Sequence, residues 1–416
     1  MKKTLTLKGL ILIVVVLFSS ELFAQLSLTG EFRPRTEYRH GYKTLSATDA
    51  DAAFFTSQRT RFNVHFKGEN FKVGLSLQDV RTWGSVKQLN ISDEYLAVHE
   101  AWAQYFFTDG ISIKVGRQEL VYDDHRIFGN VGWTQQARSH DVAIFKFRDA
   151  NFKLDAGFAY NQDKENLFGT VYNLKNYKAF QYLWAHTNFG KVAASFLVLN
   201  NGIQYQAIGD PAYPTAYSQT YGTRLTYDEK GFSFAGAFYG QGGKNGSNKD
   251  LSAYYYALEA GLELNHEFKV VVGYEFLSGN DQQDVGGMAD KSFTPLYGTN
   301  HKFNGFMDYF YVGNNVGGLG LKDFYTTIKF KKDKFSANGT VHLFSTVGSL
   351  ESVNLEKSLG TEFDFTFAYK FNKYVTLSAG YSQMFGKDAL EFVKGGDSSE
   401  TNNWIWMMFT FKPKFM

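Results

Sequence analysis

Arginine is the residue type that offers the most chemistry in this chain, and it is concentrated in the first third. Of the eleven arginines, ten lie between Arg33 and Arg148, and the last is Arg224. A guanidinium group keeps its charge at physiological pH and binds a carboxylate through two parallel hydrogen bonds. The sequence therefore predicts a site for anions. The candidate residues are Arg33, Arg35, Arg39, Arg59, Arg61, Arg81, Arg117 and Arg138.

The spacing of the first arginines predicts a β-strand. In GEFRPRTEYRH, residues 30–40, every odd position from 31 to 39 is charged, and no even position from 32 to 38 is. Successive side chains of a strand point to opposite faces, so these five charges share one face. An arginine facing mid-membrane lipid costs about 2–4 kcal/mol, so the odd face is expected to line an interior. Pro34 lacks a backbone donor and is expected at a bulge or near a rim.

Alternation of apolar and polar residues recurs along the whole chain and predicts eighteen strands. Clear examples are RTRFNVHFK (59–67), FKVVVGYEF (268–276) and TEFDFTFAYKF (361–371). Eight short polar turns alternate with nine long loops, without exception. The short turns are 67–70, 108–110, 149–151, 188–191, 228–231, 265–267, 331–334 and 371–373, and the long loops include 82–97, 119–138, 161–177, 200–219 and 278–322.

This asymmetry of connections is typical of outer-membrane barrels, which have tight periplasmic turns and long extracellular loops. The fold class expected is all-β, a transmembrane antiparallel β-barrel of about 18 strands. An even number of strands places both termini in the periplasm. A soluble propeller or solenoid would also have many short strands. Aromatic residues near the strand ends, and a last strand with alternating apolar residues up to Phe411 and Phe415, favour the barrel and its insertion by barrel-assembly machinery.

The N-terminus and the composition agree with export to the outer membrane. Lys2, Lys3 and the apolar run 10–18 precede Ala24, which predicts a signal peptide over 1–24 and a barrel domain over 25–416. Beyond residue 24 no apolar run approaches the roughly 18 residues of a membrane helix. Aromatic residues make up 18% of the chain and cysteine is absent. A net charge of +2 gives no argument for nucleic acid as a partner.

Other constellations predict no catalytic or cofactor chemistry. On a strand, the SHD of 139–141 would place His140 on the face opposite its neighbours. The DDH of 123–125 is interpreted as turn chemistry, and GNDQQDVGG (279–287) as a flexible outer loop in preference to a Ca²⁺ site. Trp102 and Tyr255 are inward aromatics that would suit either sugar stacking or packing. No enzyme, cofactor or metal is expected.

The arginines have two possible roles inside a barrel. Barrels of 16–18 strands usually enclose an aqueous channel, and arginines on its wall would attract anions. The alternative is bracing of the wall, in which they pair with Glu31, Glu37, Asp79, Glu100 and Glu119. Residues 25–150 contain 15 acidic and 16 basic side chains, a balance that suits bracing. A mixed role is also compatible with the sequence.

Six segments, taken in order, resemble the alginate export family of outer-membrane proteins. They are RPRTEYR, QRTRFNVHFK, LQDVRTWG, VGRQEL, GNVGWTQQARSHDV and PLYGTNHKFNGFMDYF, which span about residues 30–311. The resemblance implies an eighteen-stranded barrel with an arginine-rich, anion-selective constriction and loops that occlude the pore. On the matching segments these arginines are Arg33, Arg35, Arg59, Arg61, Arg81 and Arg117, with Arg138 from a loop. Because the periplasmic turns are short, gating is expected from 82–97 or 119–138.

The function expected is a channel of the Gram-negative outer membrane that passes anionic saccharides, such as uronates or an acidic polysaccharide. Its partners would be the outer-membrane lipid, the saccharide and a periplasmic export or uptake component. Two alternatives remain open. One is a closed structural or adhesion barrel with a braced lumen, and the other is a surface barrel hydrolase that uses groups such as Asp124 and His125.

Overall fold

The computed structural model describes residues 25–90, 92, 94–169, 172, 176–206, 213–310 and 316–416. The signal peptide expected over 1–24 lies outside the described residues. Strands form nearly all of the regular structure. Among the described residues, none of the helices is long and apolar enough to cross a membrane.

The strands follow one another along the chain with short interruptions. They are β1 Leu26–His40, β2 Ala53–Lys67, β3 Phe71–Thr82, β4 Leu96–Phe106, β5 Ile111–Gln118, β6 His140–Arg148, β7 Phe152–Tyr160, β8 Ala179–Phe189, β9 Val192–Gln204, β10 Thr215–Glu229, β11 Phe232–Lys244, β12 Asp250–Glu263, β13 Phe268–Leu277, β14 Ala289–Asp290, β15 Leu321–Lys332, β16 Phe335–Ser345, β17 Ser358–Lys370, β18 Val375–Gly386 and β19 Asn402–Phe411. Short helical turns lie in the loops: η1 Gln282–Asp284, η2 Asn300–Lys302, η3 Glu351–Val353 and α2 Asp388–Lys394.

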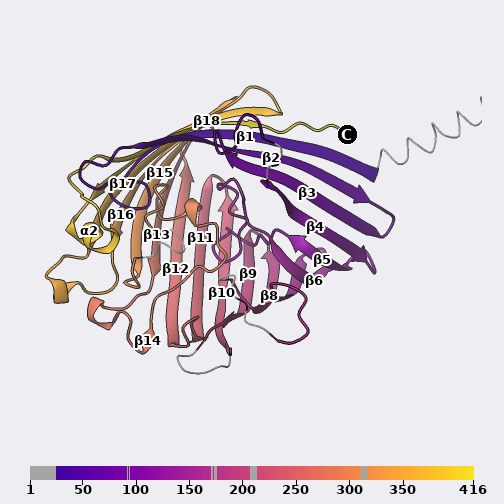
Figure 1. Cartoon of the computed structure of the whole chain (residues 1–416), viewed down its shortest axis with the longest axis horizontal. Coiled ribbons are helices and arrows are strands. Elements are labelled where there is room, and N and C mark those ends of the chain that lie inside the picture. Colours follow the sequence, from indigo (N-terminus) through magenta and orange to yellow (C-terminus); the bar gives the residue numbers. More distant parts are fainter. Residues whose placement is uncertain are drawn as a thin grey trace, which may run out of the picture.

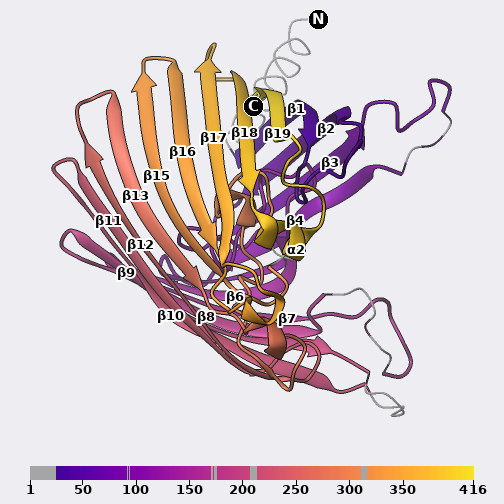
Figure 2. The same cartoon turned by 90° about the vertical axis from the view of Figure 1, so that its left-hand side faces the viewer.

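The strands form one closed antiparallel barrel, as the sequence predicts. Each wall strand pairs with its sequence neighbour, and β1 pairs with β19 to close the wall, for example Arg35 with Met408. Figures 1 and 2 show β1 in indigo beside the yellow C-terminal strands. β14 has only two residues and pairs in parallel with β12, so the described wall consists of the other eighteen strands. Closure leaves no open edge in the described wall.

The two faces of the wall differ as the alternation predicts. On β1, Phe32 is 39% exposed, whereas its neighbour Arg33 is 7% exposed. Large apolar side chains such as Phe62, Leu258 and Ile328 are exposed on the outer face. An apolar outer face is stable because it contacts lipid, and the polar side chains of the wall point into the lumen.

The connections divide the barrel into a short-turn end and a long-loop end, with two corrections to the expected pattern. The connection 245–249 lies at the long-loop end but is as short as a turn, so alternation without exception is wrong. The loop expected over 200–219 is reduced to 205–214, because β9 and β10 extend into it. Pro34 lies in the middle of β1, where the register against β2 is unbroken, so neither a bulge nor a rim position is correct.

Two long loops fold inward and supply much of the buried core. They are 119–139, between β5 and β6, and 278–320, between β13 and β15, and we call them the loop pair. Phe128 and Tyr297 of these loops pack against Tyr177 and Phe180 from the wall and its adjoining loop. The lumen thus contains these two loops as well as the inward side chains of the wall.

Candidate functional site

The two members of the loop pair join through their backbones inside the lumen. Phe128 and Tyr297 form an isolated parallel bridge, and their rings stack with centroids 5.6 Å apart. The Tyr297 amide donates to the Ile127 carbonyl at 3.1 Å, and the Thr299 amide donates to the His125 carbonyl at 2.9 Å. Backbone bonds of this kind satisfy polar groups that would otherwise be buried unpaired. The loop pair is therefore one connected body.

A stack of rings and one guanidinium strengthens this junction. Trp133 of one loop lies on His301 of the other, with centroids 4.4 Å apart and ring planes 14° apart. The Arg35 guanidinium lies 4.0 Å from the centroid of Trp133. Trp404 and Trp406 of β19 meet Trp133 edge-on at 5.5 and 4.8 Å. Stacked aromatic and cation–π contacts each contribute about 0.5–2 kcal/mol, so Trp133 is held from three sides.

Three of the predicted arginines bind backbone carbonyls of the loop 119–139. Arg33 Nη1 donates to Gly132 O at 2.8 Å, and Arg35 Nη1 donates to Trp133 O at 2.6 Å. Arg59 Nη1 reaches Gln135 O at 3.3 Å. The exposure of these arginines is 7% for Arg33, 5% for Arg35 and 4% for Arg59. Their side chains position the loop.

Two glutamates on β1 balance the charge of these arginines. Glu31 Oε1 lies 2.5 Å from Arg59 and 3.7 Å from Arg33. Glu37 lies 2.8 Å from both Arg35 and Arg39, and it accepts a hydrogen bond from Trp404 Nε1 at 2.9 Å. Buried charges require such partners, because removing one leaves the other desolvated and unpaired.

On β17, which β18 and β19 separate from β1, carboxylates hold the loop 278–320 through its amides. Glu362 accepts the Met307 amide at 2.8 Å, and Asp364 accepts the Phe306 amide at 3.1 Å. Gly305 has φ of +83°, and a Cβ there would lie 2.6 Å from the Glu362 carboxyl, so only glycine fits. Both acids are absent from the candidate residues predicted from the sequence. Their signal was their inward parity in TEFDFTFAYKF.

A further carboxylate pair holds the same loop through Asn304. Asn304 Nδ2 donates to Glu275 at 3.0 Å and to Asp323 at 3.1 Å. Arg126 from the other loop donates to the same Glu275 oxygen at 2.9 Å. His342 Nδ1 lies 2.9 Å from Asp323 and completes this network. Carboxylates of the wall thus hold the loop 278–320, and one of them, Glu275, also binds Arg126 of the loop 119–139.

Asp308 ties the loop pair to the loop 41–52 that follows β1. Its carboxylate accepts hydrogen bonds from Tyr42 Oη and from His301 Nδ1, the latter at 2.8 Å. Burial alone would raise the pKa of Asp308, but attraction to His301 and the hydrogen bonds from His301 and Tyr42 hold that pKa below its usual value. Asp308 therefore stays ionised at neutral pH.

The other predicted arginines have several different environments. Arg39 faces inward with its side chain 30% exposed, and Arg61 faces inward beside Gln78 at 2.8 Å. Arg138 donates to Gly298 O at 3.1 Å and links the two loops. Arg81 lines the edge of a cavity together with Arg39. The inward parity expected for Arg81 and Arg117 is nevertheless wrong, because each shares a strand face with outward apolar residues. Those residues are Phe71 and Val73 on β3 and Val115 on β5. Arg81 pairs with Asp79, and Arg117 with Asp141.

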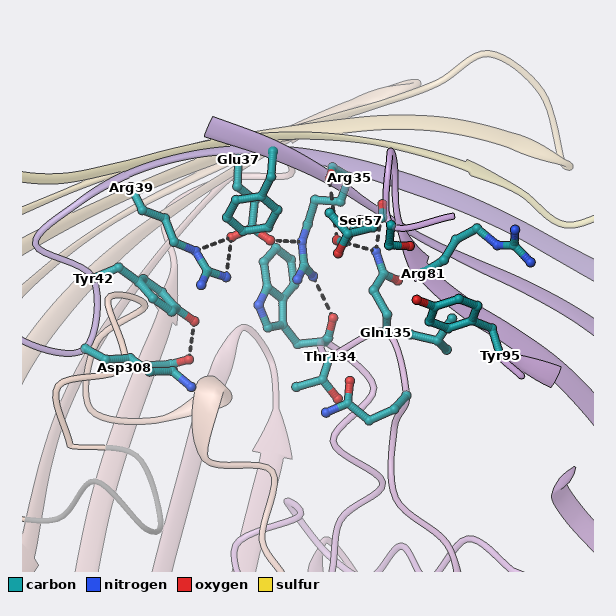
Figure 3. Close-up of a pocket in the computed structure, with 17 residues that line it drawn as sticks. Arg35, Glu37, Arg39, Tyr42, Ser57, Arg81, Tyr95, Thr134, Gln135 and Asp308 are labelled. Atoms are coloured by element: carbon teal, nitrogen blue, oxygen red, sulfur yellow. Dashed lines mark hydrogen bonds and ion pairs between the residues drawn. The ribbon is translucent and has the colours of Figure 1, made fainter. Parts of the chain in front are cut away.

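A cavity of about 420 Å³ opens on the long-loop side of these contacts. Arg35, Arg39 and Glu37 of β1 line it together with Tyr42 and Asp308, as Figure 3 shows. In that view the Arg81 side chain at the edge of the cavity extends away from the others. The cavity therefore presents partly exposed Arg39 beside a network of ion pairs, an arrangement suited to weak contact with a passing anion.

The remaining constellations have structural partners. Asp123 accepts Trp184 Nε1 at 3.2 Å, and Asp124 pairs with Arg224 at 2.8 Å. Burial raises the pKa of Asp123 and lowers that of His125. Tyr255 is buried against Phe293. Among the described residues, no group of three or more His, Cys, Asp or Glu side chains could hold a metal ion, and this includes the segment 279–287.

Comparisons with known proteins agree with this architecture. Solved structures of similar fold include OccAB4 of Acinetobacter baumannii, with 12% identity, a TM-score of 0.64 and coverage of 94% of this chain and 98% of that one. OpdL of Pseudomonas aeruginosa has 13% identity and a TM-score of 0.64, and the match covers 94% of this chain and 100% of that one. A BenF-like porin from Pseudomonas fluorescens Pf-5 has 10% identity and a TM-score of 0.62, and the match covers 94% of this chain and 99% of that one. No curated protein matches the sequence.

These relatives share the fold of outer-membrane porins, and the sequence itself identifies the family. The family model described as "Alginate export" matches residues 24–404, nearly the whole chain. This confirms the resemblance drawn from the six segments of residues 30–311. The chain belongs to the alginate export family of outer-membrane β-barrel proteins.

Proposed function

We propose that this protein is an outer-membrane channel for anionic saccharides, with the short-turn end and both termini in the periplasm. The observation that carries the proposal is the pair of loops held across the lumen of an eighteen-stranded wall. Folded inward, the loops narrow the lumen, and the cavity beside them exposes a guanidinium. A narrow passage whose cationic side chains bind anions only weakly would favour anions and still release them.

The arginines divide between two tasks under this proposal. Arg33, Arg35 and Arg59 position the loop 119–139, because their donors are already used by its carbonyls. Arg39 and Arg61 are the predicted arginines that face the lumen without binding a loop carbonyl in the described contacts. Selectivity is assigned to these two.

The test is the reversal potential of the reconstituted protein in a planar bilayer across a KCl gradient. We expect a steady current that favours chloride, and a shift toward potassium in the double variant Arg39→Gln/Arg61→Gln. Lys87→Gln removes an exposed charge in the loop 83–95 and is the matched control. An unchanged reversal potential in the double variant contradicts the assignment of selectivity.

One observation favours a second candidate, the closed barrel with a braced lumen. Arg33, Arg35 and Arg59 are all paired with glutamates and bonded to a loop that crosses the interior. A closed barrel would give no current under any voltage or salt condition. The same bilayer experiment therefore separates the two candidates.

A further inference from the structure

A row of cationic side chains crosses adjacent strands near the short-turn end. Lys67 of β2 pairs directly with Lys72 of β3, Lys72 with Gln104 of β4, and Gln104 with Lys114 of β5. The row continues on β6 and β7, where Arg148 pairs with Lys153. We call these cations the basic band: Lys67, Lys72, Lys114, Lys146, Arg148 and Lys153.

The basic band faces the lumen. Lys67 and Lys72 line a cavity of about 460 Å³ with Trp102, and the other four cations line a second cavity of about 430 Å³ with Gln104. Trp102 and Gln104 lie two positions apart on β4 and share its inward face. The two cavities therefore adjoin along one wall.

Two rungs of the band place like charges directly opposite each other. Such rungs, Lys67 with Lys72 and Arg148 with Lys153, destabilise a sheet unless counter-charges are present. The like-charge rung between Arg33 and Arg59 has such a counter-charge in Glu31. In the basic band, only the rung of Arg148 with Lys153 has a described carboxylate as its counter-charge.

Asp155 is the acid inside the band, and it lies 2.6 Å from Lys146 and 2.5 Å from Arg148. Glu119, at the edge of the second cavity, is bound by His99 and Asn130, both at 2.7 Å. Glu100 accepts the Glu119 amide at 3.1 Å. Four cations of the band have no described carboxylate within 4.0 Å, the terminal group of Met416 included. They are Lys67, Lys72, Lys114 and Lys153.

One of these four unpaired lysines is held in a fixed place by aromatic packing. The Lys114 ammonium lies 3.7 Å from the centroid of the Trp102 indole. Trp102 itself lies against Gly74, where a Cβ would approach the ring to 2.5 Å. A cation–π contact keeps an ammonium in place without neutralising its charge. Lys114 is thus oriented and still able to bind an anion.

We propose that the basic band is a binding site for carboxylate groups of an acidic saccharide, separate from the arginine network and located at the opposite end of the lumen. This proposal rests on the proposed function, because the basic band is where a solute that enters the channel from the short-turn end would bind first. Carboxylates spaced along a sugar chain supply the counter-charges that the band lacks. Lysine suits this task, because its hydrated, flexible ammonium exchanges partners more readily than a bidentate arginine.

The experiment measures block of single-channel current by a uronic-acid trimer added to each chamber in turn, with a neutral hexose trimer as the solute control. We expect the triple variant Lys67→Gln/Lys72→Gln/Lys114→Gln to weaken block from the short-turn side by about tenfold. The triple arginine variant at the same positions should retain block within about twofold, because it retains the charge. The matched control is Lys331→Gln/Lys370→Gln/Lys373→Gln, at the same end but outside the band.

A thermal unfolding measurement separates binding from support of the fold. Because the like-charge rung is lost, the glutamine triple should be as stable as the wild type or more stable. A lower unfolding temperature assigns the lysines to the fold and overturns the proposal. Equal weakening of block in the control triple also overturns it, in favour of general charge at the mouth.

Two further outcomes distinguish this site from the channel itself. An anion-selective wild type that the uronate trimer does not block overturns the site and leaves the channel for anions standing. A wild type that carries no current overturns both proposals.

Discussion

Trp133 and His301 stack with ring centroids 4.4 Å apart, although 168 positions separate them in the chain. This contact joins two loops that start from different parts of the wall. Arg35 covers the indole, and Asp308 accepts the His301 Nδ1 hydrogen bond. The geometry of the loop pair thus depends on a small number of side chains, which makes it open to mutational tests.

Replacing Trp133 by alanine should open the lumen. The variant loses its contacts with His301, Trp404 and Trp406. Truncation of a fully buried tryptophan costs about 3–5 kcal/mol, and half-buried Trp133 should cost less. We expect a larger single-channel conductance and a lower unfolding temperature. Trp83→Ala, at an exposed position, is the control. Wild-type conductance in a folded Trp133→Ala variant would show that the stack does not set the width.

Glu362 offers a test in which charge and hydrogen bonding are separated. Glu362→Ala removes the acceptor of the Met307 amide, and a buried unsatisfied donor costs about 1–3 kcal/mol. Glu362→Gln retains a carbonyl oxygen at the same place. We expect noisier current from the alanine variant only, because the loop 278–320 loses one of its anchors. Equal noise in both variants would assign the effect to the lost charge.

Asp308 predicts that acid loosens the loop pair. Its folded-state pKa is depressed, so the carboxylate contributes stability that is fully present above its unfolded pKa of about 3.9. That stability is lost as the pH falls through the lower folded pKa. Channel noise should therefore rise on acidification from pH 5 toward pH 2, and Asp308→Asn should weaken this dependence. A wild type with constant noise over this range would contradict the prediction.

Lys394, at the end of helix α2, predicts a dependence of the same sign at higher pH. Burial lowers its pKa to about 7, whereas an unfolded lysine titrates near 10.4. The unfolded chain therefore binds more protons between these values, and stability rises with pH across that window. Lys394→Met should raise the unfolding temperature at pH 6 and remove this rise. The measurement is thermal unfolding at pH 6 and pH 9.5.

The wall could be predicted from the sequence because its rules are local. Alternation of residues 30–40 is enough to place Arg33 and Arg35 inside and Phe32 outside. The same rule, applied to ISIKVGRQ, would have placed Arg117 outside with Val115, so that error came from following residue type in preference to parity. The position of Glu362 was available in the same way.

The loop 119–138 was expected to gate the pore, but its pairing with the loop 278–320 could not be predicted, for a different physical reason. Its contacts join residues far apart in the sequence, such as Arg33 with Gly132 and Phe128 with Tyr297. Most of these bonds are made to backbone carbonyls and amides, which every residue type carries. The sequence pattern of the loops therefore contains little information about where they bind.

The anchoring of the loops has a consequence for how such a channel can diversify. Arg33 and Arg35 recognise carbonyls of 132–133, and Glu362 and Asp364 recognise amides of 306–307. Apart from the contact of Arg35 with the Trp133 indole and the bonds of Arg33 to Gln135 Oε1, these contacts do not involve side chains of the loops. New side chains can therefore be introduced into either loop while its path across the lumen is retained, and the preference for a solute becomes adjustable independently of the shape of the pore.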